Sequence, residues 1–527
     1  MDEEVALKCN VCGEAAAQRC GACRNVAYCN REHQKKDWKT HKLLCKPPPF
    51  EVECNDELGR HLVATRDLQA GEVIVSEAPL VAGPKQVSAP LCLGCHAARP
   101  RARCSRCLWP LCSLSCTHPA AECAALSVAC APLEFGDDDE PHYAYEAITV
   151  LRCVLLQKMN PRRWRLLSSM EAHENKRKGT EIYKENQIRV VGFLRNFVGL
   201  GGWDEKIWDT SEKTLHRLTG ILDVNALEIR LTEATELQAL YATASLLEHS
   251  CVPNVRLVFD DSLRLSVSAS VAIPKGAHIK TMYTHALWGT QARRQHLLDN
   301  KYFLCHCERC ADPTELATMF SALRCVGGCE EAYLLPKEPL NAESDWTCNG
   351  GCGSTLTAAH ASELVLRLAD EVEHVLSRGD VPSLEVLLSR LERLTHPNHY
   401  HQFAVKHSLL QQLARNPSAS SESEEVRKKA MCERLLAVTQ TLDPGAARLA
   451  AYEGVLCVEL HSVRLQLARR RDDAEHHRTE TQAARDLLQR AVHILRFEPK
   501  HLPEGKLAII AQTSLAELNS RLEQICK

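Results

Sequence analysis

Cysteine is the residue type that most constrains how this chain can fold. The sequence has 27 cysteines in 527 residues, and all but six fall into four clusters with short spacings. The first residues, Met1-Asp2-Glu3-Glu4-Val5, are acidic and lack the apolar stretch of a secretory signal. In a reducing compartment, clustered cysteines are metal ligands more often than disulfides. We therefore expect zinc sites to hold much of the fold together.

Length and charge narrow the class of protein. A chain this long exceeds what one hydrophobic core serves, so roughly two to four domains are expected. The net charge of −3 and the pI of about 6.8 give no basic excess for binding nucleic acid. No apolar run approaches the roughly 20 residues of a membrane span, so we expect no membrane contact.

The first cluster offers eight ligands, enough for two tetrahedral zinc sites. Each Cys-x2-Cys pair can hold one metal, because a tight turn brings its sulfurs within coordination distance. The order of the ligands predicts two interleaved sites. A segment this short has little core, so the metal must supply much of its folding free energy. The predicted sites are Cys9, Cys12, Cys29 and His33, and Cys20, Cys23, His41 and Cys45.

Three further sets of ligands follow. The second cluster repeats the ligand order of the first and predicts a second two-zinc module. In the third, Cys305, Cys307 and Cys310 need a distant fourth ligand, for which Cys251 is the candidate. The second set is Cys92, Cys95, Cys104, Cys107, Cys112, Cys116, His118 and Cys123; the fourth, similar to a zinc ribbon, is Cys325, Cys329, Cys348 and Cys352. The remaining cysteines, expected as buried apolar thiols, are Cys54, Cys130, Cys153, Cys432, Cys457 and Cys526.

Periodicity predicts strands before residue 300 and helices after residue 360. We expect a strand pair within 50–85, connected by a turn at 69–72, and a hairpin within 255–283, where apolar and polar residues alternate. Residues 141–240 are predicted to be mostly helical. Further amphipathic helices, typical of a helical-repeat array, are expected within 360–396 and at 425–442, 446–470, 474–496 and 505–525.

The first cluster resembles a MYND finger. Tyr28 precedes Cys29, and Trp38 lies shortly before His41, as in that family. The resemblance implies binding of proline-rich peptides or partner proteins. A purely structural clip is the alternative reading of the same ligands.

The layout as a whole resembles the SET-and-MYND protein lysine methyltransferases. The duplicated cluster and the ribbon-like segment are similar to the arthropod SmydA-like branch. The implied fold class is α+β, with a β-rich SET domain split by zinc-binding MYND insertions and followed by an all-α helical-repeat-like C-terminal domain. The implied modules are 1–48 (MYND finger), 50–90 (N-terminal part of SET), 91–125 (second MYND-like module), 126–240 (helical SET insertion), 241–304 (SET core), 305–355 (post-SET zinc and zinc-ribbon-like segment) and 360–527 (C-terminal helical domain).

The resemblance also implies chemistry. In that family, S-adenosylmethionine and a substrate lysine meet in a narrow channel, where tyrosine hydroxyls and backbone carbonyls orient the neutral amine. Tyr283 matches the catalytic channel tyrosine, 22 residues before Cys305. The positions that match cofactor-binding residues are Gly59, Arg60, Asn225, Ser245, Leu247, Glu248, His249, Tyr283 and Phe303.

Three positions depart from the family's pattern. The glycine-rich cofactor loop has His61 in place of its second glycine, which permits close backbone approach. Glu248 stands where an asparagine is expected, replacing an amide donor with a negative charge. The second channel tyrosine falls at Lys301, with Tyr302 one position later.

Two hypotheses follow for function. The first is transfer of methyl from S-adenosylmethionine to a protein lysine, histone lysines included. The second is a catalytically weak or inactive adaptor that binds partner proteins and regulates transcription. A DNA-bound regulator is disfavoured by the charge balance. We expect zinc and S-adenosylmethionine as cofactors, a monomer, and a cytoplasmic or nuclear location.

Overall fold

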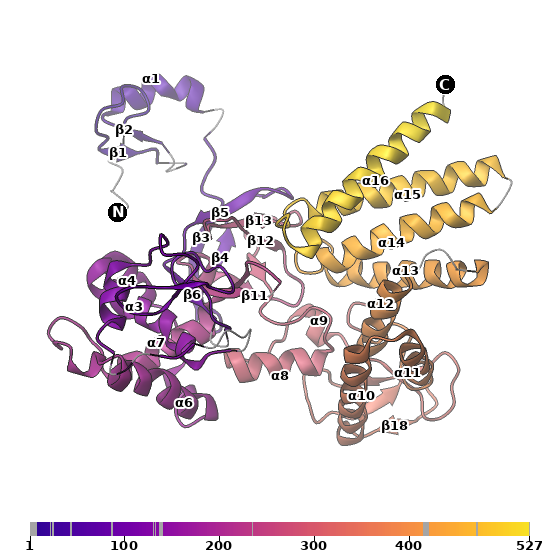
Figure 1. Ribbon diagram of the computed structural model, residues 1–527. Helices are drawn as coiled ribbons and strands as arrows, with labels where there is room; N and C mark the ends of the chain where they lie inside the picture. The colour runs from indigo at the N-terminus through magenta and orange to yellow at the C-terminus, as the bar shows by residue number, and fades with distance from the viewer. Residues whose placement is uncertain are drawn as a thin grey trace.

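The computed structural model describes residues 8–525 except 22, 24–25, 43–44, 86–87, 130, 132, 136–140, 234, 415–420 and 471–472. Figure 1 shows a small N-terminal module at one corner, a central region of short strands, and a stack of helices at the C-terminal side. Because sheets and helices occupy separate parts of the chain, the expected α+β fold class is confirmed. No helix among the described residues is long and apolar enough to cross a membrane.

The N-terminal module is a short hairpin followed by a helix. The hydroxyl of buried Tyr28 donates to the Asp37 carboxylate at 2.7 Å, which ties the helix to the hairpin. The Asn30 side chain caps the helix by accepting from the backbone N–H of His33 at 2.8 Å. The elements are β1 (Gln18–Arg19), β2 (Ala27–Tyr28) and α1 (Arg31–His41).

One sheet of the central region joins strands that are far apart in sequence. The predicted pairing across the turn at 69–72 is wrong: β4 pairs with β3, whereas β5 pairs with β13 of a distant hairpin. Pairing with β13 places β5 in a three-stranded sheet, which buries more apolar surface than a lone hairpin can. The strands are β3 (Phe50–Asn55), β4 (Gly59–Ala64), β5 (Val73–Glu77), β12 (Val255–Phe259) and β13 (Leu265–Ala269).

The predicted hairpin is present. β12 pairs antiparallel with β13, with Val255 opposite Ala269 and Leu257 opposite Val267. Leu265, Val267 and Ala269 are buried while the serines between them are half-buried. The alternation seen in the sequence therefore corresponds to one face of the sheet on the core.

The region predicted as mostly helical is helical only to Asn225. Residues 227–240 form β9 and β10 instead, and β10 pairs with both β9 and β6. These strands complete the floor of the cavity described below. The elements are β6 (Val81–Pro84), η1 (Tyr143–Ala147), α3 (Ile148–Met159), α4 (Pro161–Ser168), α5 (Glu174–Arg177), α6 (Glu181–Asn186), the π-helix η2 (Gln187–Phe197), η3 (Leu200–Gly202), α7 (Glu212–Asn225), β9 (Leu227–Arg230), β10 (Glu236–Leu240) and η4 (Ala244–Leu246).

The second zinc module lies against this helical region. It consists of a two-stranded hairpin and a short helix whose buried side chains join the main hydrophobic core. Trp109 of this module packs its ring 5.4 Å from that of Tyr145. The elements are β7 (Ala102–Arg103), β8 (Pro110–Leu111) and α2 (Ala120–Leu126).

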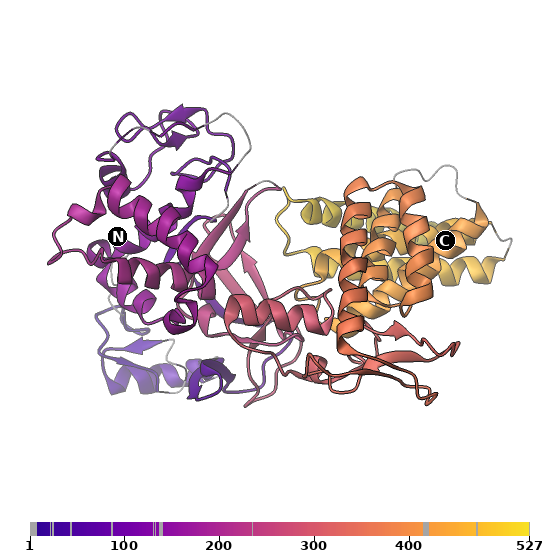
Figure 2. The same cartoon turned by 90° about the horizontal axis from the view of Figure 1, so that it is seen from below.

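A second hydrophobic core joins the cysteines of the third cluster to the C-terminal helices. Cys251, Phe320 and Phe403 are fully buried in it. Seen from below in Figure 2, the small sheet β15–β18 lies against the base of α10 and α11. The elements are β11 (Glu248–His249), β14 (Lys280–Thr281), α8 (Thr290–Lys301), α9 (Glu308–Ala311), β15 (Leu323–Arg324), β16 (Tyr333–Pro336), β17 (Trp346–Cys348), β18 (Thr355–Leu356), α10 (Ala358–Arg378), α11 (Val381–Leu394), α12 (Tyr400–Ala414), α13 (Glu422–Leu442), α14 (Ala450–Arg469), α15 (Ala474–Leu495) and α16 (Pro503–Ile525).

The cysteines outside the clusters divide into two kinds. Cys153, Cys432 and Cys457 are buried, as expected. Cys54 is exposed, so the expectation for it is wrong: it lies on β3, a strand of a two-stranded ribbon that is open to solvent along most of its length. Cys130 and Cys526 lie outside the described residues.

Candidate active site and zinc centres

The structure gathers the predicted zinc ligands into compact sets of four. In five of these sets all ligand atoms lie within 4.8 Å of one another, and the four sets of the two N-terminal modules have the interleaved order that the sequence predicts. A tetrahedron with zinc–sulfur bonds of about 2.3 Å has sulfur–sulfur edges of about 3.8 Å. The observed Sγ–Sγ distances fit: 3.7 Å for Cys12–Cys29 and for Cys20–Cys45, 3.6 Å for Cys104–Cys123 and Cys251–Cys310, and 3.5 Å for Cys92–Cys116 and Cys325–Cys352.

One set in the second module has a supporting layer that the sequence analysis missed. The Nδ1 atom of His118 lies 2.9 Å from a carboxylate oxygen of Glu122, which is fully buried. Arg152 of α3 donates to the same carboxylate at 2.5 Å and to the carbonyls of Ala82 and Leu93 at 2.8 Å. A carboxylate behind a metal-binding imidazole fixes its orientation and tautomer. The signal was available: Glu122 lies four residues after His118 on a helix.

The set formed by Cys251, Cys305, Cys307 and Cys310 also has a buried cation beside it. Arg293 donates to Cys251 Sγ at 3.2 Å and to Cys310 Sγ at 3.4 Å. Arg293 also pairs with Glu315 at 2.6 Å, both side chains being buried, and donates to the Trp288 carbonyl at 2.6 Å and to the Thr290 hydroxyl at 3.1 Å. Four thiolates around Zn²⁺ leave two net negative charges, which the guanidinium offsets. No spacing pattern links Arg293 to these cysteines, so sequence analysis could not have found it.

Tyr283 and His249 form the centre of the candidate active site. Tyr283 donates its hydroxyl to the Leu247 carbonyl, and burial raises the pKa of this phenol, which therefore stays protonated. The backbone N–H of Tyr283 donates to His249 Nδ1 at 3.0 Å, while His249 Nε2 lies 3.5 Å from Cys251 Sγ. Burial lowers the pKa of His249 to about 4, so its ring is neutral. The imidazole thus connects the segment that follows β14 to the zinc set.

The remaining predicted cofactor residues surround this pair. Phe303 lies with its ring 5.7 Å from His249. Asn225 ends α7 and donates both amide hydrogens to backbone, to Glu171 and Ile221 carbonyls at 2.8 Å, which leaves its amide oxygen as an acceptor. Ser245 donates to the Ala242 carbonyl at 3.2 Å. Arg60 also lines the cavity and donates to the Ser169 carbonyl at 2.9 Å, and Gly59 beside it has a φ of +64°.

Two of the three departures, Glu248 and His61, share His278 as a neighbour. Glu248 accepts from His278 Nδ1, and the His278 ring lies 4.8 Å from that of His61. His61 is buried, and its own Nδ1 lies 3.0 Å from the Gly59 carbonyl. The imidazole therefore folds back against β4 and His278. The Glu248 carboxylate therefore binds His278, whose ring also contacts His61.

The third departure, Lys301, lies in the pocket. Its amine donates to the backbone carbonyls of Asp223 and Val224 at 2.9 and 2.8 Å and lies 5.9 Å from the centre of the Tyr283 ring. Tyr302 has a left-handed backbone with a φ of +63°, and its hydroxyl is 3.5 Å from Arg177. The phenol of Tyr302 therefore contacts α5 rather than pairing with Tyr283.

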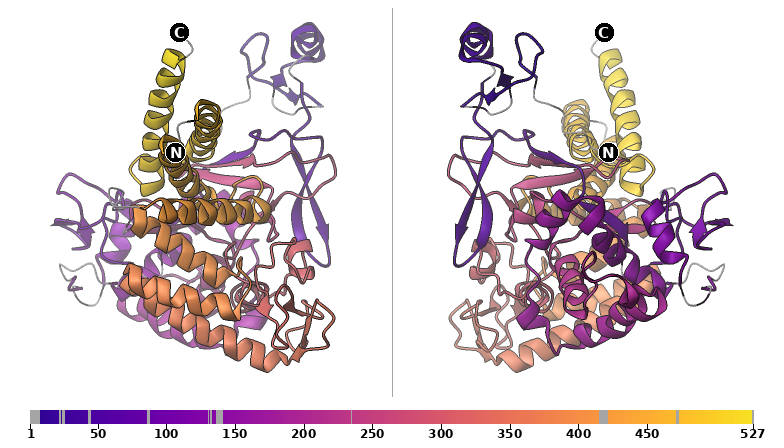
Figure 3. Two further views of the ribbon diagram at one scale, coloured as in Figure 1. Left: turned by 90° about the vertical axis from the view of Figure 1, so that its right-hand side faces the viewer. Right: turned by 90° about the vertical axis from the view of Figure 1, so that its left-hand side faces the viewer.

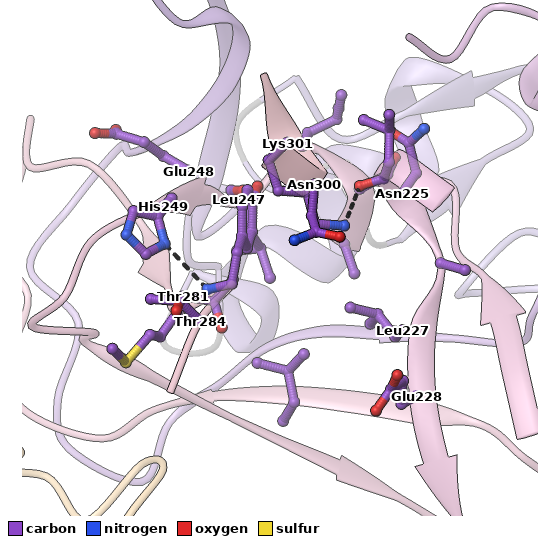
Figure 4. Close-up of a pocket in the computed structure, with 18 of the residues that line it drawn as sticks. Asn225, Leu227, Glu228, Leu247, Glu248, His249, Thr281, Thr284, Asn300 and Lys301 are labelled. Carbon is purple, nitrogen blue, oxygen red and sulfur yellow. Dashed lines mark hydrogen bonds between the residues drawn. The ribbon is translucent and has the colours of Figure 1, made fainter. Parts of the chain in front are cut away.

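These residues line one cavity of about 2000 Å³ between the central strands and α8. Figure 4 shows His249, Lys301 and Asn225 facing this space, with Leu227 and Glu228 of β9 at its floor. The cavity is large enough for a nucleoside cofactor together with a peptide side chain.

Comparison with known proteins identifies the class. Residues 9–45 match the MYND finger family and residues 59–284 match the SET domain family. Together these matches assign to the chain a MYND finger and a SET domain, the pair of domains that the sequence analysis predicts.

The relatives agree with that assignment. The chain is 30% identical over 318 residues to the SET domain-containing protein SmydA-8, isoform A, of Drosophila melanogaster, covering 58% of this chain and 65% of that protein. It is 27% identical over 318 residues to the human histone-lysine N-methyltransferase SMYD3, covering 56% and 70%. The chain thus spans just under two thirds of the first relative. The solved structure of Rubisco LSMT bound to AdoMet matches over 92% of this chain and 93% of that one at 11% identity, but the TM-score of 0.29 is too low to support an argument.

Proposed function

We propose that this protein transfers a methyl group from S-adenosylmethionine to the amine of a protein lysine, histone lysines included. The observation that carries the proposal is the buried Tyr283 hydroxyl, hydrogen-bonded to the Leu247 carbonyl beside His249, in a cavity of the SET region. Two relatives with this domain pair, SMYD3 of human and of mouse, are named histone-lysine N-methyltransferases. S-adenosylmethionine, when bound, supplies an electrophilic methyl group on a sulfonium.

The chain's own residues would prepare the acceptor amine. An ammonium has no lone pair, so the substrate lysine must lose a proton to solvent before it attacks. The Tyr283 oxygen and the Leu247 carbonyl then offer acceptors that direct the remaining N–H groups. The hydrogen bond from the Tyr283 backbone to His249 fixes the segment that carries the phenol. Burial of the Tyr283 phenol excludes water from the reacting atoms.

The pocket keeps most of the positions expected to hold the cofactor and departs from the expected pattern at His61, Glu248 and Lys301. One cavity is lined by five of the residues predicted to bind the cofactor: Asn225, Ser245, Leu247, His249 and Phe303. Gly59 keeps the backbone conformation that a close approach needs. We assign the zinc ions to the six cysteine and histidine sets; of these, the set of Cys251, Cys305, Cys307 and Cys310 borders the cavity, through Cys305 and Cys307.

Calorimetric titration of the zinc-loaded protein with S-adenosylmethionine tests the proposal. We would compare the native chain with Glu248→Asn and His61→Gly. Binding by the native chain, followed by transfer of labelled methyl to histones that Tyr283→Phe abolishes, would establish the activity. Absence of binding in all three proteins would overturn it.

The second candidate is an adaptor with weak or no activity. It is favoured by the contacts among the departures: Glu248 is held by His278, His61 packs on that ring, and Lys301 fills the place of a channel tyrosine. Binding in the Glu248→Asn variant alone would support this candidate. The MYND finger is a protein-interaction module; we propose that it takes proline-rich partners and that the protein regulates transcription.

The remaining assignments are proposals of the same kind. We divide the chain at the module boundaries given in the sequence analysis, assign it to the cytoplasm, the nucleus or both, and expect a monomer that contacts nucleic acid indirectly or not at all. Light scattering and fractionation of cells test the last two.

A further inference from the structure

Lys301 places a cation inside the candidate methyl-transfer cavity. The amine accepts no hydrogen bonds and donates to two carbonyls in the last turn of α7, those of Asp223 and Val224. The C-terminal end of a helix carries about half a unit of negative charge, which attracts an ammonium but does not neutralise it. Lys301 is therefore fixed in position with part of its charge uncompensated.

The nearby carboxylates offset this charge only in part: Asp223 and Glu228 both raise the pKa of Lys301, but burial lowers it by more. Asp223 pairs with Arg177 at 2.5 Å, and Glu228 pairs with Lys85 at 2.7 Å. Each of these acids already has a cation. The charged and titratable groups that face Lys301 from the surrounding elements are Asp223, Arg177, His173, Glu228, His296, Asp299 and Tyr283.

The position of this cation matters because of what the cavity has to hold. The amine is 5.9 Å from the centre of the Tyr283 ring, the residue assigned to the reacting atoms. S-adenosylmethionine carries a positive sulfonium, whereas its demethylated product is a neutral thioether of nearly the same shape. In a partly buried cavity, two like charges several ångströms apart repel by a few kcal/mol at most. The thioether has no charge and is therefore not repelled by Lys301.

We propose that Lys301 makes this pocket prefer S-adenosylhomocysteine to S-adenosylmethionine, so that its occupancy follows the ratio of product to cofactor. The inference rests on the proposed function, since it assumes that the cavity binds S-adenosyl ligands. Under this proposal, bound S-adenosylhomocysteine blocks further turnover until it leaves the pocket.

Titration calorimetry on the full-length zinc-loaded protein tests this without an activity assay. The probes are S-adenosylmethionine, S-adenosylhomocysteine and sinefungin, which carries an ammonium in place of the sulfonium. We would compare the native chain with Lys301→Met, which removes the charge, and Lys301→Arg, which keeps it. Lys213→Met, on the exposed start of α7, is the matched control.

The expected result is a change in the ratio of the two dissociation constants. Lys301→Met should reduce the preference for the thioether about tenfold, and sinefungin should follow S-adenosylmethionine. Lys301→Arg and Lys213→Met should leave the ratio as it is. Since burial lowers the pKa of Lys301 to about 8, raising the pH from 7 to 9 should reduce the native preference in the same direction.

Two outcomes separate the proposals. If both ligands bind and Lys301→Met leaves their ratio unchanged, the inference is wrong and the proposed cofactor site stands. If neither ligand binds to the native chain or to Lys301→Met, the proposed function itself fails. Circular dichroism and zinc content would show that each variant is folded.

Discussion

The two N-terminal zinc modules share a ligand order but differ in how they join the rest of the protein. In the first, the metal sets are backed by a contact within the module, Tyr28 to Asp37. In the second, His118 is backed by Glu122 and through it by Arg152 of the helical region. Figures 1 and 3 show the first module standing away from the body of the molecule. The same metal chemistry thus makes a separate binding module in one case and part of the main core in the other.

This contrast predicts the largest effect for loss of a zinc ligand. A structural zinc contributes roughly 10–16 kcal/mol to folding. Cys107→Ser should therefore unfold the second module and lower the thermal midpoint of the SET region by many degrees. Cys23→Ser should unfold the first module alone and leave that midpoint unchanged. Scanning calorimetry with zinc quantification checks both; equal shifts would refute the contrast.

The next effect concerns the buried carboxylate. Glu122→Gln keeps the shape of the side chain but leaves Arg152 as a buried cation without its acid. Breaking such a pair costs about 3–5 kcal/mol. We expect a loss of this size in the free energy of unfolding of the SET region, measured by urea denaturation. Glu146→Gln is the control, since the partner of Glu146, Arg189, is half exposed.

A smaller effect is expected in the first module. Tyr28→Phe removes one hydrogen bond to Asp37, worth about 1–2 kcal/mol because the acceptor is charged. Zinc release from the first module to a chromogenic chelator should become several-fold faster. Release from the second module should not change, and a change there would show that the two modules are coupled.

The C-terminal helices provide a zinc-free region for the same comparison. Burial lowers the pKa of His407 to about 4, below its ordinary value near 6.5. Between these values the unfolded chain binds the proton and the folded one does not, so stability is lost as the pH falls from about 6.5 to 4. His407→Gln should reduce this loss by about 1 kcal/mol, measured by denaturation at pH 7 and pH 5. The exposed His374→Gln should not.

Much of the fold and part of the site could be predicted from the sequence. The ligand sets and their interleaving were predictable because a Cys-x2-Cys pair chelates through a local turn. The hairpin of β12 and β13 was predictable because its alternation is local too. The pairing of β5 with β13 and the strands at 227–240 were not, because a short apolar segment does not specify its partner.

The sequence by itself determined which residues can hold zinc, the order of the modules, and the three positions that depart from the SET pattern. Only the tertiary structure decided what those departures do: that Glu248 is held by His278, and that the Lys301 amine lies in the cavity near Tyr283. It also decided which zinc module is free and which is part of the core. The physical reason is the separation along the chain over which each interaction acts. Chelation and periodicity act over a few residues, whereas the charge of a cavity is the sum of groups that only folding brings together.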